Sequence, residues 1–292
     1  MPIMSIRDVS LYVKTMGSGY PLVLMHGGPG VDHTTMLPFR SSADRFTLVF
    51  YDHRCNGRSE GAPVSSMTWE NLTADADALR DRLGFERWAV LGHSFGGQVA
   101  LEYALAYPDR ISHLILLDSG GDSRWALENA ADLLARRGYS SKKVELVRRW
   151  FNGKFEPNEM LPIFMRIGDA YSYRRGLLRF LLNTALAGLQ GGWRSKPRPE
   201  ALIFAGTQLA PGWTVMDRLG EIGVPTLVMA GREDFVFPPE HQAQLAAGIP
   251  NARLHIVERA GHNPHYDRSA EVMEAVREFI TADSAVAESS NN

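Results

Sequence analysis

The segment Gly92-His93-Ser94-Phe95-Gly96 constrains the fold of this chain more than any other part of the sequence. The apolar run Trp88–Leu91 comes directly before it and an amphipathic stretch follows, which predicts a strand, a sharp turn and a helix. Glycines two residues before and two after the serine remove the Cβ atoms that would clash in such a turn. The turn would lift the Ser94 hydroxyl above a sheet edge and aim the Phe95 N–H where an oxyanion forms.

Length and composition set the outer limits. The 292 residues allow one large α/β domain or two small ones, and 45% hydrophobic residues are enough for a sizeable core. The net charge of −2 predicts no nucleic-acid partner, and the single Cys55 excludes an internal disulfide. Residues 1–5 lack the pattern of a signal peptide, and no window approaches the ~20 apolar residues that span a bilayer. We therefore expect a cytoplasmic protein without a membrane partner, of undetermined oligomeric state.

Short apolar runs alternate with helical patterns along most of the chain. Several of the runs are continuous, which is typical of strands buried on both faces. Alternating strands and helices predict an α/β fold, a mostly parallel sheet with helices on both faces, whose site lies at one sheet edge. The predicted strands are Leu11–Val13, Leu22–His26, Thr47–Tyr51, Trp88–Leu91, Leu114–Leu117, Thr226–Ala230 and Leu254–Val257. The predicted helices are Leu72–Leu83, Gln98–Tyr107, Glu240–Ala247 and Ala270–Ile280.

The alternation stops between about Arg124 and Trp213, where only helical patterns occur. We expect residues 123–212 to form a helical lid inserted between two strands of a core made of residues 1–122 and 213–284. The small polar residues 285–292 are expected to form a disordered tail. Residues 124–198 carry 15 Lys and Arg against 6 Asp and Glu, a net +9. That charge either covers solvated helix faces or forms a positive rim that favours anionic substrates.

Three residues have the chain order and the loop positions of a serine nucleophile with its base and its orienting acid. Ser94 comes first, Asp234 follows the predicted strand Thr226–Ala230, and His262 follows the next predicted strand. We assign Ser94 as nucleophile, His262 as general base and then acid, and Asp234 as the anion that orients the histidine. Asp118, which also ends a strand, and Glu233 are the rival acids.

The other histidines near these loops suggest structural roles. His26 and His93 flank glycine turns, where an imidazole can hydrogen-bond its own loop. His265 follows His262 by three residues, but the segment between them contains Pro264 and lacks the helix that would place two ligands on one face. The sequence therefore predicts no metal site.

A glycine-rich segment, residues 26–30, follows another buried strand and reads His-Gly-Gly-Pro-Gly. Glycines allow the backbone to approach a substrate oxygen closely. We expect the N–H of Gly28 to be the second oxyanion donor beside that of Phe95, with Gly27 as the fallback.

These segments, together with Asp52–Ser59, Gly-Arg-Glu-Asp at 231–234 and Gly-His at 261–262, resemble the α/β-hydrolase superfamily. Within it, His-Gly-Gly-Pro-Gly and the Asp52–Ser59 segment are similar to the proline iminopeptidase (prolyl aminopeptidase) family of serine peptidases. The match covers about residues 5–122 and 213–280. The resemblance implies an α/β-hydrolase fold with a helical lid and no cofactor. It also implies a small-molecule or short-peptide substrate, cleaved at an amide or ester bond through an acyl-enzyme.

The chain departs from that family at two positions. Cys55 stands where a glycine is usual, and Phe235 stands where members often carry a glutamate that helps to hold the substrate amine. The resemblance places Glu200 near the second amine-binding position, and we take Glu200, Phe235 and Gly27 as candidate substrate contacts. The lid residues Glu156 and Glu159 are further candidates. A carboxylesterase, lactonase or amidase with the same three residues stays open, as does a non-hydrolytic ligand receptor or a lyase.

Overall fold

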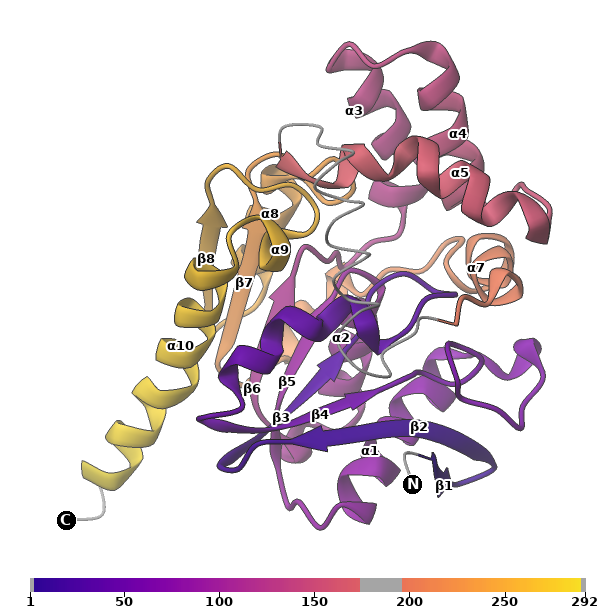
Figure 1. Cartoon of the computed structure of the whole chain (residues 1–292). Helices are drawn as coiled ribbons and strands as arrows, with labels where there is room; N and C mark the ends of the chain where they lie inside the picture. Colours follow the sequence, from indigo (N-terminus) through magenta and orange to yellow (C-terminus); the bar gives the residue numbers. More distant parts are fainter. Residues whose placement is uncertain (1–2, 174–195, 290–292) are drawn as a thin grey trace.

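The computed structural model describes residues 3–173 and 196–289 (Figure 1). Eight strands form one sheet in the order β1-β2-β4-β3-β5-β6-β7-β8. β1 and β2 are antiparallel to their neighbours, and the strands from β4 to β8 along the sheet are parallel. The predicted fold class is confirmed. The strands are β1 (Ile3–Ile6), β2 (Val9–Met16), β3 (Tyr20–Met25), β4 (Phe46–Tyr51), β5 (Trp88–His93), β6 (Ile111–Leu117), β7 (Thr226–Gly231) and β8 (Ala252–Val257).

Helices cover both faces of the sheet. α1 (Trp69–Arg82), α2 (Phe95–Ala106) and α8 (Pro239–Gly248) contribute to the apolar core on one face. The 3₁₀ helix η1 (His33–Ser42) and α10 (Ser269–Ser289) contribute to the core on the other face. In β3, Val23 enters the first core while its neighbours Leu22 and Leu24 enter the second. Alternate side chains of one strand are thus buried on opposite faces, which explains the continuous apolar runs.

The register of the parallel strands aligns their carboxyl ends. Leu117 of β6 pairs with His93 of β5 on one side and with Met229 of β7 on the other. Gly231 of β7 pairs in turn with Val257 of β8. The loops that follow β5, β6, β7 and β8 therefore emerge side by side, at what we call the carboxyl edge.

A group of short helices lies between β6 and β7 in the chain, and we call them the inserted helices: α3 (Ala130–Arg136), α4 (Ser141–Phe151), α5 (Met160–Ile167) and α7 (Pro199–Phe204). Figure 1 shows α3, α4 and α5 beyond the carboxyl edge of the sheet. They share a third apolar cluster with Phe235, Val236 and Phe237 from the loop after β7. Residues 174–195 of the predicted lid lie outside the described residues, so the lid boundaries stay a prediction.

Two elements differ from the sequence-based expectations. β1 was not expected, because four residues at the edge of a sheet leave little periodicity to detect. α10 continues to Ser289, beyond the predicted helix end at Ile280, and the disordered tail stays a prediction. Ala285, Ala287 and Glu288 favour helix, so they extend the amphipathic segment before them. Residues 290–292 lie outside the described residues.

The one-turn helix α9 (Pro264–Asp267) connects the loop after β8 to α10. In the part of the chain that the structure describes, no helix combines the length with the apolarity that crossing a bilayer requires.

Candidate active site

The Gly-x-Ser-x-Gly segment forms the tight turn between β5 and α2. Ser94 has φ 52° and ψ −119°, a conformation with positive φ that side chains other than glycine rarely adopt. A Cβ atom at Gly92 would clash with the backbone of Gly96, and one at Gly96 would clash with the backbone after β3. The Ser94 N–H donates to the Leu117 carbonyl at 3.0 Å, and the Ser119 hydroxyl donates to the Ser94 carbonyl at 2.7 Å. The strand β6 and its loop therefore hold the turn in its strained conformation.

The structure brings Ser94, His262 and Asp234 together as one hydrogen-bonded chain. The Ser94 Oγ lies 2.9 Å from Nε2 of His262. Nδ1 of His262 lies 2.9 and 3.0 Å from the two carboxylate oxygens of Asp234. With Nδ1–H donating to the carboxylate, Nε2 is left to accept the serine proton. This arrangement can generate a nucleophilic alkoxide from Ser94.

Backbone and ring contacts hold the histidine and the acid in place. The Val236 N–H donates to Oδ1 of Asp234 at 2.8 Å. Nε2 of His93 donates to the His262 carbonyl at 2.9 Å, so His93 has a structural role that extends to the loop after β8. The ring of Tyr171, from the segment after α5, lies edge-on to the His262 imidazole at 5.5 Å between centroids. No motif in the sequence points to Tyr171, because only packing brings it to this loop.

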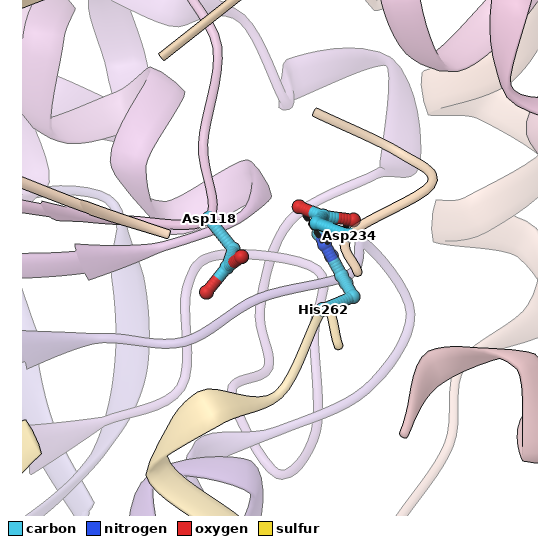
Figure 2. A group of neighbouring side chains, drawn as sticks. All are labelled: Asp118, Asp234 and His262. Atoms are coloured by element: carbon cyan, nitrogen blue, oxygen red, sulfur yellow. Dashed lines mark hydrogen bonds and ion pairs between the residues drawn. The ribbon is translucent and has the colours of Figure 1, made fainter. Parts of the chain in front are cut away.

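The rival acids do not contact the imidazole. Asp118 is fully buried at the end of β6, and its Oδ1 accepts the Gly231 N–H at 2.9 Å. Figure 2 shows Asp118 to one side of Asp234 and His262, whose side chains overlap in this view. The side chain of Glu233 is exposed. Asp234 therefore has the geometry of the orienting acid.

The two expected oxyanion donors border the same cavity as Ser94. Phe95 begins α2, so its N–H has no partner within the helix. Among the described residues, neither the Phe95 N–H nor the Gly28 N–H donates a hydrogen bond to another backbone group. Gly28 has φ 48°, a conformation that favours glycine. Two free N–H groups beside a serine hydroxyl can stabilise an oxyanion.

The inserted helices and the segments next to them line one side of the cavity above Ser94. The cavity measures about 170 Å³ and also contacts Gly27, Gln98 and Val236 of the core. Among the described residues that line it, none is an aspartate, glutamate, lysine or arginine. Its lining is mainly apolar, and the contributing residues between β6 and β7 are Ser123, Ala126, Leu127, Trp150, Phe151, Phe164, Tyr171, Leu202, Ala205, Gly206 and Ala210.

A family model described as alpha/beta hydrolase fold matches residues 20–269. The chain belongs to this family. This α/β hydrolase is 27% identical over 290 residues to a 2-hydroxy-6-oxo-6-phenylhexa-2,4-dienoate hydrolase of Comamonas testosteroni, covering 94% of this chain and 92% of the relative. It is 28% identical over 268 residues to the proline iminopeptidase PfmaB of Pestalotiopsis fici, covering 89% and 92%. The resemblance inferred from the motifs is confirmed.

A solved structure of a thermophilic esterase from Thermogutta terrifontis superposes on this α/β hydrolase with a TM-score of 0.73 at 26% identity. The superposition covers 97% of this chain and 99% of the esterase. The names of these three relatives describe three different kinds of substrate. The family therefore supports hydrolysis and leaves the substrate of this α/β hydrolase open.

The candidate substrate contacts separate in the structure. Gly27 lines the cavity, but Phe235 is 1% exposed and packs against the rings of Phe151 and Tyr171. Its apolar ring joins the cluster under the inserted helices, and Phe235 is not among the described residues that line the cavity. Glu200 lies in a separate hollow, half exposed, with its carboxylate 3.6 Å from the Arg198 guanidinium. The structure thus does not place Glu200 or Phe235 against a substrate near Ser94.

The two further glutamates of the predicted lid lie elsewhere too. Glu159 forms an ion pair with Arg149 at 2.8 Å, and its other contact is the Glu156 N–H. Glu156 is exposed to solvent. In the described part of the chain, no carboxylate from the inserted segment is available to hold a substrate ammonium in the cavity.

Asp118, Asp234 and His262 also form a compact group of potential metal ligands. One ligand atom of each lies within 4.8 Å of the other two. A metal on Nδ1 of His262 would replace the proton that this nitrogen donates to Asp234, and the group supplies fewer than the four ligands of structural zinc. The chemistry of the three groups therefore fits a proton relay better than a metal centre. The absence of a metal site stays a prediction.

Burial keeps most histidines around the site neutral. It lowers the pKa of His26, His53 and His93, and it lowers the pKa of His241 to about 4 and that of His265 to about 3. His26 shows the structural role expected of it. Its Nδ1–H donates to the Gly27 carbonyl at 2.9 Å, and its Nε2 accepts the His53 N–H at 3.2 Å. This pair of bonds fixes the glycine-rich loop that carries Gly28.

Proposed function

We propose that this α/β hydrolase is a serine hydrolase that cleaves small, uncharged esters through an acyl-enzyme. The observation that carries the proposal is the 2.9 Å contact between the Ser94 Oγ and Nε2 of His262 at the wall of an apolar cavity. Asp234 fixes the tautomer that this contact requires. The free N–H groups of Phe95 and Gly28 border the same cavity.

The proposed reaction has two halves that use the same groups. Nε2 of His262 accepts the Ser94 proton while Oγ attacks the ester carbonyl carbon, and the carbonyl oxygen becomes an oxyanion between the Phe95 and Gly28 N–H groups. The bond to the alcohol oxygen then breaks, and that oxygen takes the proton from His262. Water repeats the attack on the acyl-serine with His262 as base. The products are a carboxylic acid, an alcohol and free Ser94.

The cavity lining supports an uncharged substrate. Trp150, Phe164 and Leu202 offer apolar surface, and the described lining residues include no group of fixed charge. Burying an ammonium or a carboxylate without a partner of opposite charge is costly. An apolar acyl or alcohol group therefore suits this cavity better than a free N-terminus or a dicarboxylate. The alkoxide released from an ester is also a better leaving group than the nitrogen anion of an amide, because it is the weaker base.

The test is a substrate panel combined with active-site labelling. The panel contains p-nitrophenyl acetate and butyrate, a lactone, proline p-nitroanilide and a 2-hydroxy-6-oxo-dienoate. We expect kcat/KM for the p-nitrophenyl esters to exceed that for proline p-nitroanilide by at least about tenfold. A fluorophosphonate should label Ser94 in the wild type and nothing at this position in Ser94→Ala.

Other outcomes would identify the alternatives. Preferred turnover of proline p-nitroanilide would indicate an aminopeptidase, and preferred turnover of the dienoate would indicate a carbon–carbon bond hydrolase. Ser94 that a fluorophosphonate fails to label, with no burst of p-nitrophenol, would overturn the serine-hydrolase proposal in favour of a receptor or lyase.

A further inference from the structure

Asp118 is a buried carboxyl group that the mechanism above does not use. It is 0% exposed, and its φ of 43° is unusual for a residue other than glycine, although aspartate tolerates it better than most. Oδ1 accepts the Gly231 N–H at 2.9 Å. Oδ2 has no hydrogen-bond partner among the described residues. Burying an ionised carboxylate oxygen without a hydrogen-bond donor costs free energy, which favours a protonated Asp118.

The charged groups around Asp118 come from each neighbouring loop of the carboxyl edge. Asp234 follows β7 and His262 follows β8, and a ligand atom of each lies within 4.8 Å of one on Asp118 (Figure 2). Asp267 of α9 adds a further negative charge. The guanidinium of Arg137, from the inserted segment, donates to the backbone carbonyls of Glu233 and Asp234.

If Asp118 and Asp234 were both ionised, their buried carboxylates would repel each other. In a buried site the repulsion is weakly screened, and a pair of this kind commonly holds one proton between its members. Asp234 has two donors to its carboxylate, the Val236 N–H and Nδ1–H of His262. Asp118 has only the Gly231 N–H. The negative charge is therefore better stabilised on Asp234, and the proton is better placed on Asp118.

We propose that Asp118 is a positioning residue that carries the shared proton while Asp234 is ionised, and that it donates this proton to the Asp234 carboxylate as a hydrogen bond. The inference rests on the serine-hydrolase function proposed above. It gives the pair a single negative charge, which matches the single positive charge of His262 during the reaction. It also gives Asp234 a third donor, which fixes its orientation toward the imidazole.

The pKa of Asp118 agrees with this assignment. Burial raises it well above the ordinary value for aspartate, and the neighbouring charge of Asp234 raises it further. The Gly231 N–H lowers the pKa, but by less than burial or the charge of Asp234 raises it.

The proton on Asp118 should limit how strongly Asp234 attracts the imidazolium. A carboxylate that accepts an additional hydrogen bond is a weaker partner for a cation. Removing the Asp118 donor should therefore stabilise protonated His262, and activity should require a higher pH. Removing a negative charge at the same place would have the opposite effect. The direction of the change thus distinguishes a protonated Asp118 from an ionised one.

The experiment measures the rate of Ser94 labelling by a fluorophosphonate as a function of pH, which requires no knowledge of the substrate. It compares the wild type with Asp118→Asn, whose amide keeps a donor, and Asp118→Leu, which has none. We expect the midpoint of the acid limb to coincide in the wild type and Asp118→Asn. In Asp118→Leu we expect it to move up by roughly one pH unit. Thermal unfolding of each variant checks that it is folded.

Three results would overturn the inference. The first is a downward shift of the acid limb in Asp118→Asn, because that is the effect of losing an anion. The second is a folded Asp118→Leu whose acid limb coincides with that of the wild type. The third comes from infrared spectroscopy. We expect the carbonyl stretch of a protonated carboxyl in the wild type and not in Asp118→Asn. Its absence from the wild type would contradict the inference even if Asp118→Leu fails to fold.

Failure of the underlying function gives a different pattern. Wild-type Ser94 that is not labelled at any pH would overturn the serine-hydrolase proposal. The infrared band would still decide whether Asp118 is protonated, because that measurement does not depend on catalysis.

Discussion

The carboxyl edge and the inserted helices shape one cavity by different physical means. At the edge, hydrogen bonds of 2.9–3.0 Å and the register of parallel strands fix Ser94, Asp234 and His262 to within narrow limits. The inserted helices contribute apolar side chains such as Trp150 and Leu202, and these helices are held together mainly by apolar packing. In the proposed function, the edge would supply the reacting groups and the inserted helices would shape the space for the substrate.

The largest expected effect is at the edge. Ser94→Ala should lower kcat/KM for p-nitrophenyl esters by roughly 10⁴–10⁶, because loss of the nucleophile disables the covalent route. The hydroxyl contributes little packing, so the melting temperature should change little. Ser41→Ala, at an exposed serine of η1, is the control and should keep full activity. An active Ser94→Ala enzyme would show that the reaction does not depend on the carboxyl edge.

Asp234→Asn should lower kcat by about 10⁴, the loss seen for the equivalent change in another serine enzyme. The amide keeps the shape of the side chain but favours the wrong imidazole tautomer. Glu233→Gln is the matched control, since its exposed side chain is one residue away. Steady-state kinetics on one ester give kcat for both variants and for the wild type. A mild Asp234→Asn beside a crippled Asp118→Asn would show that the orienting acid was assigned wrongly.

Phe235 connects the two regions, so its truncation tests whether they are coupled. The ring lies 5.1 Å from that of Tyr171 and 6.3 Å from that of Phe151, between centroids. Phe235→Ala should reduce the free energy of unfolding by about 3–5 kcal/mol, measured by denaturant titration. Phe235→Leu should cost less. If Phe235→Ala costs under about 1 kcal/mol, the ring does not hold the inserted helices on the core.

A buried histidine gives a smaller, pH-dependent effect at the same junction. His241 of α8 contacts the Trp125 ring of the inserted segment, and burial lowers its pKa to about 4. The unfolded chain binds the proton first as the pH falls, so stability should be lost between about pH 6.5 and 4.

His241→Leu should therefore reduce the acid slope of the unfolding free energy by up to about 1.4 kcal/mol per pH unit in that range. Denaturant titrations at several pH values measure the slope. His255→Gln, at the half-exposed histidine of β8, is the control and should keep the wild-type slope. An unchanged slope in His241→Leu would show that this histidine does not contribute to acid sensitivity.

The smallest expected effect concerns the amine of a peptide-type substrate. Acetylating the amine of a proline arylamide should lower kcat/KM by less than about tenfold, or about 1.4 kcal/mol, because no described carboxylate lines the cavity. Glu200→Gln should leave that ratio unchanged. A drop of a thousandfold or more would reveal a dedicated ammonium pocket. A scan of Glu200, Glu156 and Glu159 should then locate it.

Most of the core could be predicted because its signals are local. β3, β5, β6 and β7 are continuous apolar runs, and the positions of Asp234 and His262 follow from the loops after two such strands. Parallel strands joined by right-handed crossovers end at one edge, so the loop positions alone bring the three residues near one another. β1 and the end of α10 were missed because short or terminal segments have weak periodicity.

The walls of the cavity could not be predicted in the same way. Apolar side chains in the inserted segment predict helices with a buried stripe, but not which ring faces Ser94 and which faces another helix. Phe235 illustrates the limit, since its position after Asp234 suggested a substrate contact and packing instead buries it between two aromatic rings. Glu200 likewise pairs with Arg198 away from the cavity.

The sequence by itself determined the turn at Ser94, the order of the reacting groups and the sheet that carries them, because each depends on residues close together in the chain. Tertiary structure decided that Asp234 and not Asp118 contacts the imidazole, and that the two carboxyl groups lie close together. It also decided which inserted side chains line the cavity. These outcomes depend on contacts between residues that are distant in the chain, such as Ser94 with His262 and Asp118 with Gly231, and local propensity carries no information about such contacts.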